Sequence, residues 1–590
     1  MRQFLSAQER VMLARMERAC LQSTPRGGGV AVPAAGAGTG PAPQVTAGQA
    51  QSPFGAARSG ESARLLPRFV LRSEPGPALG EPLQVPAGGL FLISDDGHGV
   101  ARALAGELTR LGASAIRLGH DPQATSTEDG FIPADLTSES TVARALAEVR
   151  RGRPPVVGLV HLLPLACDTP WDSLDLAGWR RGLRMSVKSL FYLAKGLAPD
   201  LRAAASGPGA WLVAATAMAD RTCPPDFSVG QTGIAGLLKC AAVEWPGVRC
   251  RTVHLDLGDS AEALAAQVRD EMAAGDSSIE VGYRRRRRIV YRAVPVPLPA
   301  EGGDPGLIDS RSVVLITGGA SGITAEAARE IAATYRPTLV LAGRSPFPQP
   351  SEPADTAGLT APEEIKTLLA RRFRSPGGRC ALPRLEKAYR RLMKDRQIRR
   401  NVQAMRALGA TVHYHQADVA DEQQLSRLID EVYRVHGRLD GVIHGAGIIE
   451  DRLLEEKPAD SFDRVFDTKA DSAFILCRSL RKESLRLVVF FTSMSGLCGN
   501  QGQADYAAAN EVVNSLACHL DGQTPALVRA INWGPWLGTG MLTPGAREQL
   551  ALRGIQMIPP QDGCRALLQE IQHGAKGDVV VIIGGGPWKI

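Results

Sequence analysis

Residues 313–323 read VVLITGGASGI, an apolar β-branched run that enters a glycine-rich turn and then the start of a helix. A parallel βαβ unit begins with this pattern. The missing side chains let backbone N–H groups approach a phosphate, and the N-terminus of the following helix adds partial positive charge. Turns of this kind also serve purely structural roles, so both interpretations stay open for the motif alone. The candidate phosphate contacts are Thr317, Gly318, Gly319, Ser321, Gly322 and Ile323.

The next apolar run, residues 338–343, leads directly into Arg344. An NAD-binding fold places an acidic residue near this point, where it bonds the ribose 2′-hydroxyl. A guanidinium favours a 2′-phosphate instead, which predicts NADPH as the cofactor. The alternative is a solvated arginine at the end of a strand.

An earlier stretch of the chain repeats the pattern. Residues 90–94, LFLIS, also lead from a strand into an alanine-rich helix. Two further pairs keep one constant offset: Asp135 with Asp418, and His161 with His444. The second copy carries about 60 more residues between its second and third strands. The sequence therefore predicts an α/β protein of two tandem Rossmann-like subdomains, each with a parallel sheet.

The composition agrees with a multidomain globular protein. The chain has 590 residues, of which 44% are apolar and 22% charged, and this length predicts about two to four domains. No apolar run is long enough to cross a membrane, and charges fill the first twenty residues where a signal peptide needs an apolar core. Ten cysteines without a Cys-x-x-Cys pair argue against a metal site. We expect a cytoplasmic protein that binds neither metal nor membrane.

The chain divides into four parts on these criteria. The apolar spacing of residues 1–24 predicts an amphipathic helix, and residues 25–84, rich in Gly, Ala and Pro, predict a linker. Residues 85–300 form the first Rossmann-like half, and residues 301–590 form the second.

The extra segment of the second half, residues 346–408, is a basic helical insertion. Residues 361–410 contain 14 Lys/Arg and 4 Asp/Glu, while the whole chain has a net charge of only +7. This segment is either a solvated helical hairpin or a docking surface. For the second case we favour an acidic carrier protein over nucleic acid.

The later strands of the second half are followed by further polar and glycine residues. Additional candidate cofactor contacts are Asp418, Val419, Gly445, Ala446 and Gly447. Ser493 ends another strand, and Tyr506 follows it by thirteen residues. Asn510 lies four residues after Tyr506, and Lys469 lies 37 before it.

With these four residues in place, the sequence resembles the short-chain dehydrogenase/reductase superfamily, and more closely the ketoreductase domains of polyketide and polyunsaturated fatty acid synthases. Ordinary members carry Lys four residues after the Tyr, whereas the synthase domains have Lys and Asn exchanged, as this chain does. The resemblance covers roughly residues 85–590 and implies a truncated, non-catalytic half followed by a catalytic half. One departure is Thr324, where the family has a third glycine; we interpret it as a subgroup marker.

The resemblance implies NADPH-dependent reduction of a 3-oxoacyl group on an acyl carrier protein, in the company of other synthase domains. Tyr506 would donate the proton, and Lys469 would favour the phenolate and bond the nicotinamide ribose. Ser493 would hold the carbonyl oxygen, and Asn510 would orient Lys469 or a relay water. Two alternatives stay open: a synthase scaffold with a vestigial site, and an epimerase or dehydratase on the same fold.

Substrate orientation is expected to depend on Asp451 and Gln503. The family's Leu-Asp-Asp marker for D-configured products reads Ile449-Glu450-Asp451 here, and the position of the opposite Trp marker is Cys498. We therefore expect a D-configured product.

The first half loses this chemistry at the corresponding positions. Gly318 and Gly319 become Asp95 and Asp96, whose carboxylates would repel a pyrophosphate. The other replacements are Ala217 for Ser493, Ile234 for Tyr506 and Ser186 for Lys469, while Gln503 is kept as Gln231. We predict that the first half is structural.

Overall fold

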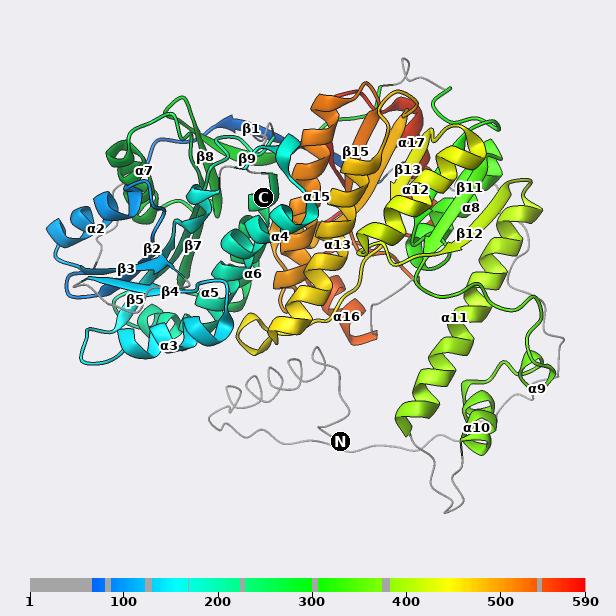
Figure 1. Cartoon of the computed structure of the whole chain (residues 1–590), viewed down its shortest axis with the longest axis horizontal. Helices are drawn as coiled ribbons and strands as arrows, with labels where there is room; N and C mark the ends of the chain where they lie inside the picture. The colour runs from blue at the N-terminus through cyan, green and yellow to red at the C-terminus, as the bar shows by residue number, and fades with distance from the viewer. Residues whose placement is uncertain are drawn as a thin grey trace, which may run out of the picture. The chain divides into compact units, whose positions relative to one another are not determined.

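In the part of the chain that the structure describes, one sheet of 16 strands passes through both halves (Figure 1). The computed structural model describes residues 66–79, 86–121, 130–167, 169–222, 229–299, 306–373, 382–538 and 544–588. The predicted helix 1–24 and most of the predicted linker lie outside the described residues.

The two halves contribute the same strand order. The second half has the order β12-β11-β10-β13-β14-β15-β16, and the first has β4-β3-β2-β5-β6-β7-β8. Neighbouring strands within each set are parallel, which is the arrangement of a doubly wound Rossmann sheet. The predicted pair of Rossmann-like halves is therefore confirmed. The bounds are β2 (Leu90–Ser94), β3 (Ser114–His120), β4 (Phe131–Ala134), β5 (Val156–His161), β6 (Ala210–Thr216), β7 (Val248–His254), β8 (Glu280–Arg284), β10 (Val313–Thr317), β11 (Thr338–Gly343), β12 (Thr411–Gln416), β13 (Gly441–His444), β14 (Leu487–Ser493), β15 (Leu527–Trp533) and β16 (Val580–Ile583).

Two antiparallel strands join the halves into one sheet. Strand β9 (Arg287–Pro295) pairs with β8, and β1 (Arg68–Pro75) lies between β9 and β16. Strand β1 falls inside the segment 25–84 for which the sequence predicted a linker. Its Val70 and Leu71 are buried, so this part of the segment belongs to the sheet.

Helices cover both faces of the sheet, as in other doubly wound folds (Figure 1). In the first half they are α2 (Val100–Arg110), α3 (Glu139–Val149), α4 (Leu176–Leu183), the π-helical turn η4 (Arg184–Lys188), α5 (Ser189–Ala205), α6 (Gly233–Glu244) and α7 (Ala261–Ala273). In the second half they are α8 (Gly322–Tyr335), α9 (Ala354–Ala357), α10 (Pro362–Arg372), α11 (Leu382–Ala407), α12 (Glu422–His436), α13 (Ala459–Ser479), α14 (Met494–Cys498), α15 (Ala504–Gln523), α16 (Pro544–Leu552) and α17 (Pro560–His573). The described residues also form short 3₁₀ turns: η2 (Leu163–Ala166), η3 (Trp171–Ser173), η5 (Val229–Thr232) and η6 (Leu454–Glu456). Among the described helices, none has both the length and the apolar character needed to cross a bilayer.

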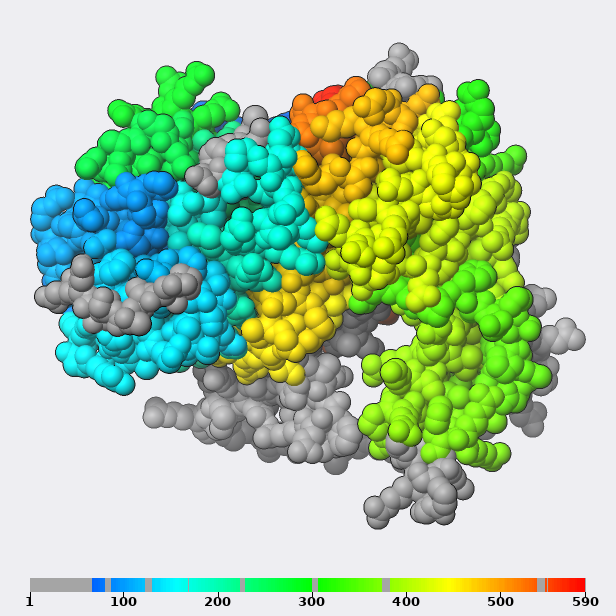
Figure 2. All heavy atoms as spheres, in the orientation of Figure 1, coloured from blue at the N-terminus to red at the C-terminus, as the bar shows by residue number. Residues whose placement is uncertain are grey.

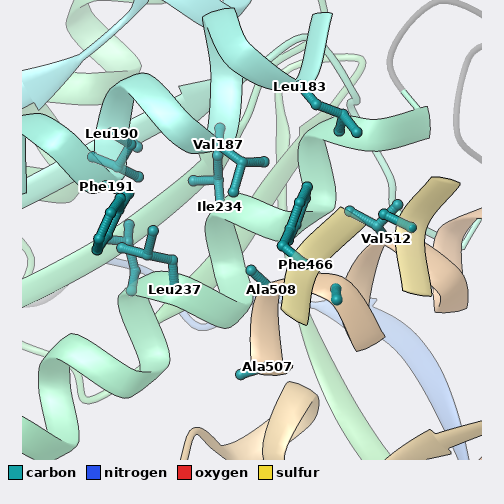
Figure 3. Close-up of a cluster of buried hydrophobic side chains, with 14 of the residues drawn as sticks. Leu183, Val187, Leu190, Phe191, Ile234, Leu237, Phe466, Ala507, Ala508 and Val512 are labelled. Carbon is teal, nitrogen blue, oxygen red and sulfur yellow. The ribbon is translucent and has the colours of Figure 1, made fainter. Parts of the chain in front are cut away.

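The halves meet through helices as well as through the sheet. Figure 3 shows apolar side chains from α4, η4, α5 and α6 packed against others from α13 and α15. Phe191 and Phe462 stack with their ring centroids 4.2 Å apart. A Cβ on Gly236 would lie 2.5 Å from the carbonyl oxygen of Ala507. The glycine therefore allows α6 to approach the backbone of α15 directly.

A buried histidine joins equivalent strands in each half. His444 Nδ1 lies 2.8 Å from Thr317 Oγ1 and joins β13 to β10, and His161 Nδ1 lies 2.9 Å from Ser94 Oγ and joins β5 to β2. Burial lowers the pKa of His444 to about 3 and that of His161 to about 4. Both imidazoles are therefore neutral hydrogen-bonding groups, and the sequence match between the halves is repeated in the contacts.

The basic insertion is helical and is anchored at one end. Helices α10 and α11 share a small apolar cluster of their own, and the C-terminal part of α11 buries Ile398, Val402 and Met405 in the core of the second half. In Figure 2 the yellow-green atoms of this region stand out as a lobe. Several of its cations are paired with acids, for example Arg396 with Glu352 at 2.8 Å.

Candidate active site

The glycine-rich turn after β10 leaves room for a ligand at the N-terminus of α8. Gly318 and Gly322 have φ angles of +75° and +63°, which side chains rarely tolerate. A Cβ on Gly319 would lie 2.7 Å from Cγ2 of Ile316. Ser321 precedes the helix without capping it through its side chain, so the first N–H groups of α8 are left for another acceptor.

Thr324, the departure from the family's third glycine, has a structural explanation. Its side chain is buried in the first turn of α8 and lies against Gly445, the first residue after β13. A Cβ on Gly445 would lie only 2.3 Å from Thr324 Oγ1. Gly445 therefore leaves the space that the Thr324 side chain occupies between α8 and the end of β13.

Arg344 is exposed at the end of β11, and the insertion brings a second cation close to it. The Asn401 side chain of α11 donates to the Ala320 carbonyl in the glycine-rich turn at 3.0 Å. Lys394 lies two helical turns before Asn401, on the same side of α11. Burial lowers the pKa of Lys394, and the positive charges of Arg344 and Arg391 lower it further. Such a concentration of cations suits a multiply charged anion.

The remaining candidate cofactor residues gather at the same edge of the sheet. Strands β12, β11, β10, β13 and β14 are successive neighbours, so the segments after their carboxyl ends converge. This edge holds Asp418 and Val419 after β12, and Gly445, Ala446 and Gly447 after β13. A Cβ on Gly447 would lie 3.7 Å from Lys469 Nζ.

Lys469 is buried on α13 and points toward the end of β14. Its Nζ donates to the carbonyl oxygen of Phe491 at 2.8 Å and lies 6.0 Å from the centroid of the Tyr506 ring. Burial lowers the pKa of Lys469 to about 8. At neutral pH the Lys469 side chain is therefore mainly charged, but it releases its proton more readily than an exposed lysine does.

Tyr506 differs from the sequence-based expectation in its electrostatics. Burial raises the pKa of the phenol, hydrogen bonding from Asn510 and Ser493 opposes this shift, and the charge of Asp451 adds to it. Lys469 is not among the groups that shift this pKa, and desolvation of the phenolate is the largest contribution. At neutral pH the side chain therefore carries its proton.

Ser493 and Asn510 flank the phenol from two elements. Ser493 Oγ caps α14 by accepting from the N–H of Ser495 at 3.2 Å. Asn510 Nδ2 donates to the backbone carbonyl of Tyr506 at 2.7 Å. Its Oδ1 is buried and has no hydrogen-bond partner among the described residues. An acceptor in that position suits a water molecule or an incoming donor.

Asp451 and Gln503, which the sequence predicted to orient the substrate, join two loops of the second half. Gln503 Nε2 donates to Asp451 Oδ1 at 3.2 Å. Glu450, which departs from the family marker, accepts from Ser461 Oγ at 2.6 Å and pairs with Arg464 at 2.8 Å. Its carboxylate is therefore bound to α13, and Asp451 alone of this pair bonds to Gln503. Cys498 lies at the end of α14.

Sequence reasoning missed a buried ion pair beside Tyr506. Lys457 is fully buried, and its Nζ lies 2.6 Å from Asp505 Oδ2 and 2.8 Å from the Glu450 carbonyl oxygen. The other oxygen of Asp505 accepts the Tyr506 N–H at 2.8 Å. The pair thus connects α15, the helix of Tyr506, to the loop of Asp451. Neither Lys457, which lies on a loop, nor Asp505 belongs to a motif that would have marked it in the sequence.

A second missed group joins α15 to the first half. Glu511 is fully buried, pairs with Arg221 and lies 3.1 Å from Lys239 Nζ. Glu280 pairs with the same two cations, at 2.7 Å and 2.6 Å. Both cations hold the pKa of Glu280 well below its usual range despite its burial. The network fixes the helix of Tyr506 and Asn510 from outside the second half.

In the first half a side chain of the protein itself binds the N–H groups at the corresponding helix start. Asp96 is buried, and its carboxylate accepts hydrogen bonds at 2.7–3.1 Å from three backbone N–H groups at the start of α2: His98, Val100 and Ala101. Asp95 pairs with Arg117 at 2.6 Å. An aspartate thus occupies the helix N-terminus that is left open in the second half.

A cavity of about 200 Å³ lies elsewhere in the first half, lined in part by Gln231 and Ser186, the counterparts of Gln503 and Lys469. The Gln231 side chain bonds the Ala217 N–H at 2.8 Å and the Pro164 carbonyl at 2.9 Å. The counterpart of Gln503 is therefore a structural residue here.

Comparison with known proteins identifies the second half. Residues 312–538 match the family model described as the KR domain. This segment is a KR domain. KR domains are the ketoreductase units of polyketide and polyunsaturated fatty acid synthases. The resemblance drawn from the Lys469, Ser493, Tyr506 and Asn510 spacing is thereby confirmed at the level of the family.

Two curated relatives align with about three fifths of the chain. The chain is 31% identical over 367 residues to one of the polyunsaturated fatty acid synthase subunits of Thraustochytrium sp., an alignment that covers 60% of this chain and 13% of that protein. It is 27% identical over 361 residues to the polyketide synthase PksN of Bacillus subtilis, covering 60% of this chain and 6% of that one. The chain thus spans a small part of the curated relatives that it matches.

Solved structures show that the two-half fold extends beyond the KR domain match. An N-terminal ketoreductase from the macrolactin assembly line aligns with a TM-score of 0.67 at 19% identity, covering 88% of this chain and 92% of that one. A structure of A-type ketoreductases from a modular polyketide synthase aligns with a TM-score of 0.63 at 21% identity, covering 88% and 93%. These alignments establish the fold.

Proposed function

We propose that the chain reduces a 3-oxoacyl group, tethered to an acyl carrier protein, to the 3-hydroxyacyl product with NADPH. The observation that carries this proposal is the convergence of Lys469, Ser493, Tyr506 and Asn510 beside an open glycine-rich turn. A scaffold has no need of this combination. The first half lacks these residues, and there the Asp96 carboxylate occupies the N-terminus of α2.

The residues at the sheet edge fit NADPH. The glycine-rich turn would receive the pyrophosphate at the N-terminus of α8, since its glycines hold conformations or spaces that side chains would disturb. Arg344 and Lys394 would hold the 2′-phosphate. When bound, the nicotinamide supplies the hydride for the ketone carbon.

The proton for the ketone oxygen comes from Tyr506 in this proposal. Negative charge develops on that oxygen during reduction, and Ser493 would stabilise it by a hydrogen bond. Tyr506 is protonated because burial raises its pKa, so it has a proton to give. Lys469, with its pKa lowered to about 8 by burial, would restore that proton through a water held by Asn510 Oδ1.

The same geometry supports a D-configured product. The hydrogen bond from Gln503 to Asp451 joins the two loops that carry these residues, while Cys498 stands at the position of the family's bulky Trp marker. An acyl chain that enters from one direction presents one face of its ketone. Chiral chromatography of the reduced thioester tests this assignment, and a predominantly L product would contradict it.

The central experiment measures NADPH oxidation with a β-ketoacyl thioester. The wild-type chain should turn over, and Tyr506→Phe should lose at least about a hundredfold in rate, the usual scale for a positioned general acid. NADPH binding, followed by fluorescence, should be unchanged in this variant. Equal turnover of the two proteins would refute the mechanism, and tight NADPH binding without any turnover would favour the scaffold alternative.

A further inference from the structure

The first half reaches the substrate side of the second half through one carboxylate. Glu244, the last residue of α6, accepts a hydrogen bond at its Oε1 from the Gly502 N–H at 2.8 Å. Its Oε2 accepts from the Leu454 N–H at 2.7 Å. The two donors belong to two different loops, the one that carries Asp451 and the one that carries Gln503.

These loops are also joined to each other. The Arg452 N–H donates to the Gly502 carbonyl at 2.9 Å, next to the side-chain bond between Gln503 and Asp451 at 3.2 Å. Gly502 has a φ angle of +81°, and a Cβ there would lie 3.4 Å from the Arg452 nitrogen. The loops thus approach each other closely at the point where Glu244 holds both.

Other contacts from α6 fix the same loop. The Cys240 thiol, one helical turn before Glu244, accepts from the Asn500 N–H at 3.3 Å. A Cβ on Gly499 would lie 2.4 Å from the Lys239 carbonyl oxygen. One face of α6 therefore holds the loop 499–502, and the Glu244 carboxylate also binds the backbone of Leu454.

The carboxylate is held there against a desolvation penalty. Burial raises the pKa of Glu244 to about 7, while the two N–H groups and the charge of Lys457 oppose the shift and Glu455 adds to it. Removing the carboxylate would leave two backbone donors unpaired at a packed boundary. A residue needed only to fill space at this place would be apolar.

We propose that Glu244 is a positioning residue for substrate recognition, which sets the separation of the two loops that bind the acyl substrate. It acts from the non-catalytic half, and it touches neither the reacting atoms nor the cofactor. The inference rests on the proposed reductase function for the meaning of these loops. The non-catalytic half would then help to determine which face of the ketone is reduced.

The test compares Glu244→Gln and Glu244→Ala with a matched control, Arg202→Ala. Arg202 forms another contact between the halves on the same loop, an exposed ion pair with Glu455 at 2.8 Å. An amide in place of the carboxylate keeps the volume but can accept only one of the two hydrogen bonds. Each hydrogen bond that the Glu244 carboxylate loses is expected to change the equilibrium constant for substrate binding about tenfold.

Kinetics and product analysis give the first readout. In Glu244→Gln we expect KM for the β-ketoacyl thioester to rise about tenfold and the minor 3-hydroxy enantiomer to increase about tenfold. The NADPH dissociation constant should stay within about twofold of wild type, since the cofactor turn is remote from α6. Arg202→Ala should behave as wild type. Unchanged KM and enantiomer ratio in both Glu244 variants would overturn the proposal.

Hydrogen exchange gives a readout that does not need turnover. The amides of Leu454 and Gly502 should exchange at least about tenfold faster in Glu244→Ala than in Arg202→Ala. Unchanged exchange at these two amides would overturn the proposal even if the reductase assay succeeds. The two proposals can also fail separately. If the wild-type chain reduces no β-ketoacyl thioester but the two variants show the expected difference in exchange, the proposed function is refuted, while the role of Glu244 in holding the two loops is supported.

Discussion

The buried network around Glu511 allows a quantitative test of how far the second half depends on the first. Glu511 belongs to α15, the helix of Tyr506 and Asn510, and both cations that neutralise it, Arg221 and Lys239, come from the first half. Glu511→Gln keeps the shape of the side chain and removes its charge. Two buried cations would then face the single carboxylate of Glu280.

The magnitude follows from the burial of the network. Glu511, Arg221 and Lys239 have side-chain exposures of 0%, 2% and 6%, so water cannot replace the lost carboxylate. Removing one member of a buried pair costs ~3–5 kcal/mol. Residues 66–590 form one compact unit, and at this size an unfolding entropy of ~1 kcal/mol per kelvin converts that loss into a drop in Tm of ~3–5 °C.

Differential scanning calorimetry measures this shift, with Asp460→Asn as the control. Asp460 also pairs with an arginine, at 2.7 Å, but both side chains are largely exposed, and its loss should change Tm little. A Tm for Glu511→Gln within 1 °C of wild type, taken as about the resolution of such a comparison, would refute the reasoning. The same argument predicts that residues 301–590 expressed alone are insoluble or inactive, because Glu511 and the edge of β16 both lose their partners.

Three further predictions concern the cofactor, the proton and the insertion. Arg344→Ala and Lys394→Ala should each weaken NADPH binding about tenfold without affecting NADH binding, as expected for a charge-assisted phosphate contact. Arg400→Ala, on another side of α11, is the control. Equal losses of affinity for both nucleotides would contradict this assignment. Turnover should fall as the pH rises through about 8. Burial lowers the pKa of Lys469 to about 8, so above this pH the side chain has lost the proton that it supplies. A rate that stays constant well above pH 8 would exclude Lys469 as the proton source. If the insertion 346–408 binds an acidic carrier protein, KM for the tethered substrate should rise with salt while KM for a small ketone should not, and equal responses would favour a solvated hairpin.

The sequence was sufficient for those features that repeat or that follow a local pattern. The run 313–323 and its weaker copy at 90–94 predicted two Rossmann-like halves, because apolar strands and glycine turns are encoded by neighbouring residues. The constant offset of His161 and His444 was a further sign, and the structure shows these residues in equivalent hydrogen bonds.

Features that depend on distant partners could not be predicted. The segment Arg68–Pro75 follows a long Gly-, Ala- and Pro-rich stretch, and only its pairing with β9 and β16 makes it a strand. Glu244 and Lys457 are single charged residues without a motif, and their roles arise from loops that the fold brings together. For Tyr506 the sequence showed a nearby lysine but not the burial that determines the sign of its pKa shift.

The two halves show opposite solutions to one physical problem, the unpaired N–H groups at the start of a helix. In the first half Asp96 satisfies those of α2 from within the chain, which stabilises the half and abolishes the anion site. In the second half the corresponding turn stays open, and buried groups such as Lys469 and Asn510 Oδ1 are left imperfectly satisfied.

A half that keeps such unfavourable features needs rigid support from outside. The first half provides it at three points of α15 and its adjoining loop: the backbone contact at Gly236, the cations around Glu511 and the carboxylate of Glu244. The hydrogen bonds that Asp96 makes in the first half stabilise it, and this stable half in turn supports the imperfectly satisfied groups of the second half.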